Sequence, residues 1–201
     1  MVMTADRHFP LWHAVVILAL VMTVLTVSAI ADAQEMSVPL DVQVQLMARI
    51  FSFDRAMDTR TKEGLTIGIL YQERFRTSVN TADEVEDLLP TAAWPADRSV
   101  RVVRIAWENR ADAERAMREQ HIGILYVTPL RSVDLQEVGD LCGTQRIPAF
   151  TGVSSYVNDG IPLGVAQRGG KAAILVNLPA ARRAGTDLSS QVLHIAEVIG
   201  E

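Results

Sequence analysis

The chain has 201 residues, of which 49% are hydrophobic, so it is long enough for one domain with a core and a targeting segment. Its formal net charge of −5 argues against a nucleic-acid-binding protein, which needs a clustered basic face, and against a polybasic protein of the membrane surface. The single cysteine excludes both an internal disulfide and a thiolate cage for zinc.

The N-terminus carries the pattern of an export signal. A polar start precedes an apolar run at residues 14–27 (AVVILALVMTVLTV), and the small residues that follow (SAIADA) fit the A-x-A cleavage pattern. We expect cleavage near Ala33, which leaves a signal peptide of residues 1–33 and one periplasmic domain of residues 34–201. The alternative is an uncleaved inner-membrane anchor at residues 11–30, because 20 mostly apolar residues just span a bilayer.

Helices and strands alternate along the first two thirds of the expected domain. In chain order we expect a helix at 38–57, a strand at 65–71, a helix at 81–89, a strand at 100–107, a helix at 110–120, a strand at 122–127, a helix at 132–141 and a strand at 147–153. Strands that alternate with helices of about ten residues are typical of a parallel sheet covered on both faces.

Three of these helices carry specific signals. In the helix at 38–57, apolar residues recur at steps of three and four and predict one apolar face. These residues are Val42, Leu46, Ile50, Phe53 and Met57. Thr81, with Glu84 three residues later, forms a capping box and predicts the start of the next helix. Ser132 is the expected cap of the helix at 132–141.

The tail of the chain has a different pattern. Two apolar segments, 163–167 and 172–177, flank Gly169 and Gly170, which predicts a β-hairpin because paired glycines supply the positive φ angles of a tight turn. A short helix is expected from Pro179 to Gly185. A last helix is expected at 188–199, with its apolar residues turned inward; these are Leu188, Val192, Ile195 and Ile199.

The sequence contains no recognisable catalytic motif. It has no phosphate-binding G-x-x-x-x-G-K-[ST] loop and no G-x-S-x-G turn, and its glycines lack the spacing of a dinucleotide loop. Cys142 and His194 could form the thiol–imidazole pair of an exported hydrolase. Cys142 is expected at the C-terminal end of a helix, however, where the helix dipole disfavours a thiolate. We therefore expect no enzyme and no cofactor, and a structural role for Cys142.

The remaining polar and aromatic groups have structural interpretations. The carboxylates at 83–87 are expected on a solvated helix face, and they lack the interspersed carbonyl ligands of a calcium site. His121 and His194 share no carboxylate at helical spacing, so we expect no metal site. Trp94 and Trp107 could stack a ligand, but positions in the core or at its rim are favoured.

The C-terminal third contains a set of short motifs. A strand that ends in a serine-containing turn is followed by a glycine-turned hairpin, an asparagine and an alanine- and arginine-rich run before the last helix. The motifs are 150–154 (FTGVS), Gly169-Gly170, Asn177, 180–185 (AARRAG) and 188–196 (LSSQVLHIA). In these motifs the chain resembles the YfiR-like periplasmic family, and the resemblance extends over about residues 38–200.

The resemblance implies both a fold and a function. The fold is an α/β, Rossmann-like three-layer sandwich with a mostly parallel sheet, a C-terminal β-hairpin and a helix. The best-understood members bind the periplasmic sensor domain of a membrane-anchored diguanylate cyclase and hold it inactive, and release raises cyclic di-GMP and promotes biofilm. The better-known members use disulfides, which a chain with Cys142 alone cannot form internally. The resemblance therefore implies a non-enzymatic regulator of an inner-membrane signalling protein that has a periplasmic sensor domain.

A second hypothesis is a small-molecule sensor or solute-binding protein. In open α/β sheets, ligands bind beyond the carboxyl ends of the strands. The candidate ligand-binding residues that follow the expected strands are Gln72, Asn109, Thr128 and Ser154. A regulator of a protein partner should instead expose an apolar patch. Both hypotheses leave a homodimer open, and they combine if a small ligand regulates the partner contact.

Overall fold

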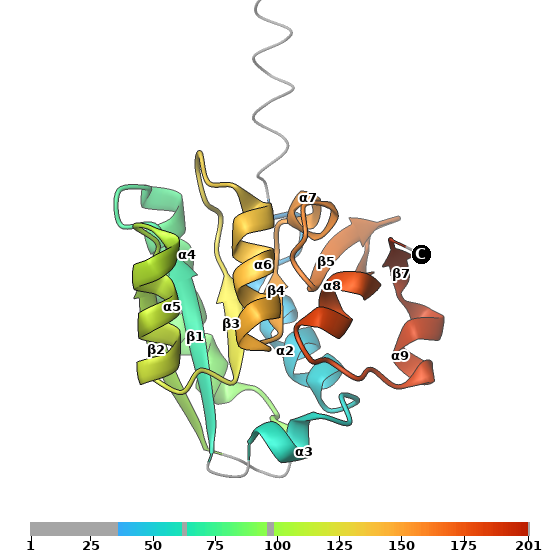
Figure 1. Cartoon of the computed structure of the whole chain (residues 1–201). Helices are drawn as coiled ribbons and strands as arrows, with labels where there is room; N and C mark the ends of the chain where they lie inside the picture. Colours follow the sequence, from blue (N-terminus) through green and yellow to red (C-terminus); the bar gives the residue numbers. More distant parts are fainter. Residues whose placement is uncertain (1–35, 62–63, 96–98, 201) are drawn as a thin grey trace, which may run out of the picture. The chain divides into compact units, whose positions relative to one another are not determined.

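The computed structural model describes residues 36–61, 64–95 and 99–200 (Figure 1). Among these residues, no helix has the length and apolar character needed to cross a membrane. The signal peptide expected at 1–33 lies outside the described residues, so its cleavage and the alternative anchor stay predictions. From Met36 onward the chain forms one compact unit.

Seven strands form a single sheet in the order β2-β1-β3-β4-β5-β6-β7 (Figure 1). The strands are β1 (Leu65–Tyr71), β2 (Val100–Ala106), β3 (Ile124–Val127), β4 (Ala149–Thr151), β5 (Leu163–Arg168), β6 (Lys171–Asn177) and β7 (Glu197–Ile199). All neighbours pair in parallel except β5 and β6, which form the predicted hairpin around Gly169 and Gly170 at φ of 55° and 78°. The mostly parallel α/β fold with a C-terminal hairpin is therefore confirmed.

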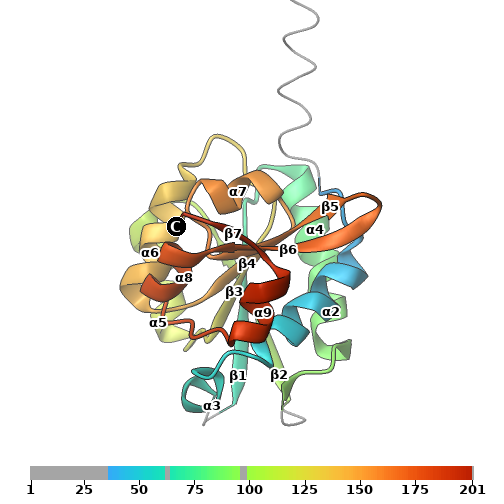
Figure 2. The same cartoon turned by 90° about the vertical axis from the view of Figure 1, so that its right-hand side faces the viewer.

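Helices cover both faces of the sheet. They are α2 (Leu40–Phe51), α3 (Met57–Arg60), α4 (Arg76–Leu88), the 3₁₀ turn η2 (Leu89–Thr91), α5 (Arg110–Glu119), α6 (Leu135–Gln145), α7 (Ser154–Asn158), α8 (Leu178–Arg183) and α9 (Ser190–Ile195). Successive side chains of a strand point to opposite faces. In β3, Ile124 and Tyr126 pack with α2 and α4, while Leu125 and Val127 pack with α5 and α6. Figure 2 shows these two helix pairs on opposite sides of the sheet.

The start of α4 differs from the prediction. The helix begins at Arg76 instead of Thr81, and Thr81 lies buried within it, so the predicted capping box does not form. The hydroxyl of Ser78 accepts the backbone N–H of Gln72 at 2.8 Å. This bond attaches the first turn of the helix directly to the end of β1, which explains the earlier start.

Helix α6, in contrast, begins three residues later than expected. Asp134 caps this helix, because its side chain accepts the N–H of Gln136 at 2.9 Å. Ser132, the expected cap, lies in the left-handed backbone region at φ 56°. Capping by Asp134 is favoured because aspartate is as good an N-cap as serine, and its negative charge also interacts favourably with the positive end of the helix dipole.

The predicted apolar face of the first helix is wrong in part. Val42 and Phe53 are 37% and 36% exposed, whereas Met47 and Phe51 are fully buried. Helix α2 also ends at Phe51, earlier than expected. Its apolar residues therefore lie on two sides, and only one side packs on the sheet.

A buried polar contact orients α2 on the sheet. Gln43 is fully buried; its Nε2 donates to the carbonyl oxygen of Val38 at 2.7 Å, and its Oε1 accepts the hydroxyl of Tyr126 at 2.6 Å. Burial raises the pKa of Tyr126, so the phenol keeps its proton and donates. Gly152 lies against this amide, and a Cβ atom there would overlap the side chain of Gln43. Gln43 is thus a polar residue of α2 that faces the sheet and is held there by two hydrogen bonds.

The expected helix at 188–199 is also corrected. It is replaced by the short α9 and then β7, which pairs in parallel with β6. Val198 and Ile199 are β-branched and favour the strand. The side chain of Ile195, the last residue of α9, does not turn inward as expected and is 69% exposed.

Candidate functional site

A buried pair of hydroxyls joins the carboxyl ends of β1 and β3. The Oγ of Ser78 lies 2.6 Å from the Oγ1 of Thr128, and Thr128 donates to the carbonyl of Leu70 at 2.9 Å. Since a hydroxyl has one proton, Ser78 is the donor to Thr128. The side-chain amide of Gln72 donates to the carbonyl of Arg131 at 3.0 Å and accepts its N–H at 2.8 Å. The fold thus brings two predicted ligand-binding residues together and uses their polar groups internally.

The other two predicted residues lie at neighbouring strand ends. Asn109 caps α5, where its Oδ1 accepts the N–H of Asp112 at 3.0 Å. Ser154 is half-buried and begins α7 after β4. Neither of these two described side chains forms a hydrogen bond to Gln72 or Thr128, so the four candidates do not form one hydrogen-bonded cluster.

A polar hollow of about 380 Å³ lies where β1 and β2 end. Its lining residues are Gln72, Glu73, Arg74, Ala106, Trp107 and Glu108. The charged residues at its rim are exposed and of both signs, while Trp107 is buried and packs into the core beneath. The hollow therefore offers donors and acceptors for a small polar or zwitterionic ligand.

A second hollow, of about 150 Å³, is formed by residues of α2, β6 and α9 and by Phe53, which follows α2. We call it the apolar hollow; its lining residues are Leu46, Arg49, Ile50, Phe53, Ile174, Val192 and Ile195. Phe53 and Ile195 are two of the three large apolar side chains exposed in the described part of the chain; the third, Val42, lies outside the hollow. The hollow thus gathers two of the exposed apolar side chains at one place on the surface.

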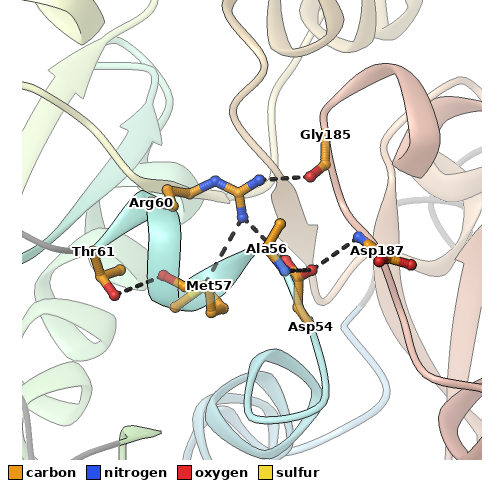
Figure 3. A network of polar contacts seen from close by, with 7 residues as sticks. All are labelled: Asp54, Ala56, Met57, Arg60, Thr61, Gly185 and Asp187. Atoms are coloured by element: carbon orange, nitrogen blue, oxygen red, sulfur yellow. Dashed lines mark hydrogen bonds and ion pairs between the residues drawn. The ribbon is translucent and has the colours of Figure 1, made fainter.

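A buried ion pair lies beside the apolar hollow (Figure 3). The carboxylate of Asp54 is fully buried and accepts Nη1 of Arg60 at 3.0 Å. It also accepts the backbone N–H groups of Ala56 at 3.0 Å and Asp187 at 2.8 Å. Arg60 donates from Nη2 to the carbonyl of Gly185 at 2.7 Å. We call this network the clamp, because it ties residues 53–60 to residues 185–189.

Backbone contacts extend the clamp to both sides of the apolar hollow. The backbone N–H of Ser189 donates to the carbonyl of Phe53 at 3.0 Å, and the backbone N–H of Arg55 donates to the carbonyl of Asp187 at 3.0 Å. Asp54 and Leu188 form an antiparallel bridge. Phe53 lines the hollow and Ser189 immediately precedes α9, so the clamp sets the position of α9 relative to α2.

The C-terminal motifs have structural roles in this region. Gly185 adopts φ 78°, a left-handed conformation that favours glycine, and presents its carbonyl to Arg60. Asn177 caps α8 by accepting the N–H of Ala180 at 3.1 Å and donates to the carbonyl of Val157 at 2.8 Å. The motifs thus build the clamp and its supports.

The thiol–imidazole pair has no support in the geometry. Cys142 is fully buried on the α5–α6 side of the sheet, and burial raises the pKa of its thiol to about 12. His194 is exposed on α9, which packs through Val192 on the opposite side. No cluster of three or more histidine, cysteine or acidic groups suited to a metal occurs within the described ranges. Trp94 is buried and donates to the carbonyl of Leu89 at 2.8 Å, which makes it a core residue.

The comparison with protein families agrees with the motifs. A family model described as YfiR/HmsC-like matches residues 41–197, which is most of the chain. The chain belongs to this family. Membership of the YfiR/HmsC-like family supports a periplasmic, regulatory role in cyclic di-GMP signalling. A comparison with curated proteins finds no match.

Solved structures resemble this YfiR/HmsC-like protein in fold. An ABC domain in complex with L-Trp from Streptococcus pneumoniae has a TM-score of 0.57 at 17% identity, over 80% of this chain and 62% of that one. A conserved domain protein from Vibrio cholerae has 0.56 at 16%, over 80% and 60%. A substrate binding protein with adhesive properties from Clostridium difficile has 0.50 at 14%, over 72% and 57%. The chain thus matches about three fifths of each structure, and the likeness shows a periplasmic-binding-protein-like α/β fold.

Proposed function

We propose that this protein is a periplasmic regulator that binds the periplasmic domain of a membrane-anchored signalling protein, such as a diguanylate cyclase, and restrains its output. The observation that carries the proposal is the apolar hollow, with Phe53 and Ile195 exposed at its rim. Family membership supports the class of partner. A signal peptide at residues 1–33 would deliver the domain to the same compartment, and the regulator acts by binding, without turnover.

The size of the apolar hollow favours a side chain of a protein over a small molecule. Pockets for small ligands usually measure about 300–1,000 Å³, whereas this hollow measures about 150 Å³. A single large apolar side chain suits that space, and binding energy at protein interfaces concentrates where such anchors enter pockets.

The exposed side chains also favour a covered state. Burying a large apolar side chain fully stabilises by about 1.5–3 kcal/mol. Ile195 is 69% exposed, so covering it recovers most of that amount, and covering Phe53 adds a smaller share. A partner surface that covers both residues therefore gains stability that the free protein lacks.

The test is co-purification of the tagged, exported protein with detergent-solubilised membranes, followed by mass spectrometry. Wild type is compared with a Phe53→Ser, Ile195→Ser double variant and with Val42→Ser, which removes an exposed apolar residue of α2 outside the hollow. We expect wild type and Val42→Ser to retain one membrane protein with a periplasmic domain and a signalling output, and the double variant to lose it and raise cyclic di-GMP. Retention by the double variant, or unchanged cyclic di-GMP, contradicts the proposal.

A second candidate function is sensing a small molecule, and the polar hollow favours it. Its volume of about 380 Å³ lies within the range of small-ligand pockets, at the strand ends where such folds bind ligands. Gln72 lines it directly, Asn109 follows its rim, and Thr128 and Ser154 lie at the adjoining strand ends. The test is a melting shift with L-tryptophan and other amino acids on wild type and Arg74→Gln. A shift that the variant loses supports this function, and no shift with any of them argues against it.

A further inference from the structure

We infer that Arg49 makes the apolar hollow selective for a partner segment that carries a carboxylate beside its apolar anchor. The inference rests on the proposed function and names the chemistry of the partner at that site. Of the seven described residues that line the hollow, six are apolar and the seventh is Arg49, which is exposed. A cation at the rim of an apolar hollow is a placement that an interface can use for specificity.

The guanidinium of Arg49 has no hydrogen bond or ion pair with another described side chain. The positions three and four residues away from Arg49 in sequence are Leu46, Gln45, Ser52 and Phe53, and none is acidic, so Arg49 has no ion-pair partner at helical spacing. Several other arginines pair with carboxylates within the described chain; these are Arg55, Arg60, Arg104, Arg115, Arg118 and Arg168. Arg49 is thus free to meet a partner.

Covering the hollow makes an acceptor for Arg49 necessary. When a partner side chain fills the hollow, it excludes water from the neighbouring guanidinium, and a desolvated charge without a partner is costly. A carboxylate meets the requirement best, because its two oxygens match the planar fork of arginine. An anionic membrane surface fits less well, since the whole chain carries a net charge of −5 and the hollow holds one side chain.

The test uses a display library of random peptides selected on the exported protein. Selected peptides are analysed further if they bind the Val42→Ser variant but no longer bind the Phe53→Ser, Ile195→Ser double variant. We expect these peptides to share a large apolar residue with Asp or Glu close to it in sequence. Arg49→Glu should weaken them by about tenfold or more, Arg49→Lys by less, and replacing the peptide acid by Lys should restore binding to Arg49→Glu.

The outcomes separate this inference from the function on which it rests. Hollow-dependent peptides without an acidic residue, or equal binding to wild type and Arg49→Glu, overturn the role of Arg49 and leave the docking surface intact. If no peptide depends on Phe53 and Ile195, the docking surface and this inference both fail. Sedimentation of wild type, but not of the double variant, with phosphatidylglycerol vesicles would also overturn the inference in favour of a lipid surface.

Discussion

Replacing Asp54 by alanine should uncouple α9 from α2 and remove partner binding while the sheet stays folded. The side chain accepts three hydrogen bonds, from Arg60 and from the N–H groups of Ala56 and Asp187. The substitution leaves a largely buried guanidinium and two backbone donors without their acceptor. Removing one member of a buried ion pair typically costs about 3–5 kcal/mol. That loss is a large part of the roughly 5–15 kcal/mol that stabilises a domain of ordinary size.

Urea denaturation measures the stability loss, and amide hydrogen exchange locates it. We expect Asp54→Ala to unfold at a lower urea concentration and residues 186–195 to exchange faster, with β1 and β3 changed less. Asp54→Asn keeps an acceptor for the backbone groups and should lose less. The control is Arg55→Gln, whose ion pair with Asp187 is exposed at 3.7 Å and should contribute below about 1 kcal/mol. A loss for Asp54→Ala no larger than for Arg55→Gln, or uniform exchange across the domain, would refute the clamp.

Three further predictions concern buried groups. Tyr126→Phe leaves the Oε1 of Gln43 buried without its donor and should destabilise by about 1–3 kcal/mol in urea denaturation; an unchanged midpoint would show that water replaces the phenol. Gly152→Ala should lower the free energy of unfolding by about 2 kcal/mol or more, because the new methyl group overlaps the side chain of Gln43. The control is Gly123→Ala, whose methyl group would make only ordinary contacts and should change the free energy of unfolding by less than about 1 kcal/mol. Burial raises the pKa of Cys142 from 9.0 to about 12, so the folded state holds this proton longer than the unfolded state. The stability advantage over Cys142→Ala should therefore be constant below pH 9 and fall as pH rises from 9 towards 12; a pH-independent difference would show an accessible thiol.

The strand pattern could be predicted well because its signals are local. The bounds of β1 coincide with the expected run at 65–71, and those of β2 differ by one residue from the expected run at 100–107. Gly169 and Gly170 turn the hairpin because their own backbone conformations decide it. Where a single residue or a short apolar run determines the structure, no distant contact is needed to predict it.

Helix ends were harder to predict because contacts with neighbouring strands decide them. Thr81 and Glu84 form a sound local signal, yet the bond from Gln72 to Ser78 starts the helix earlier. The segment at 188–199 has helical periodicity, but pairing with β6 draws Glu197–Ile199 into the sheet. The clamp had no local signal at all, since Asp54 and Asp187 are 133 residues apart.

The two exposed side chains of the apolar hollow, Phe53 and Ile195, follow the predicted apolar spacing but are not buried. Phe53 and Ile195 both follow the helical spacing of apolar residues, but spacing states only that a side is apolar and not what covers it. Helix α2 buries Met47 and Phe51 on the sheet and leaves Val42 exposed, while Phe53, two residues beyond the helix, is exposed at the apolar hollow. A single exposed residue such as Val42 needs no partner, whereas Phe53 and Ile195 are exposed together at one hollow, which is the arrangement that a docking partner can cover. The apolar spacing of Phe53 and Ile195 can be read from the sequence, whereas their exposure depends on where α2 and α9 end in the folded domain.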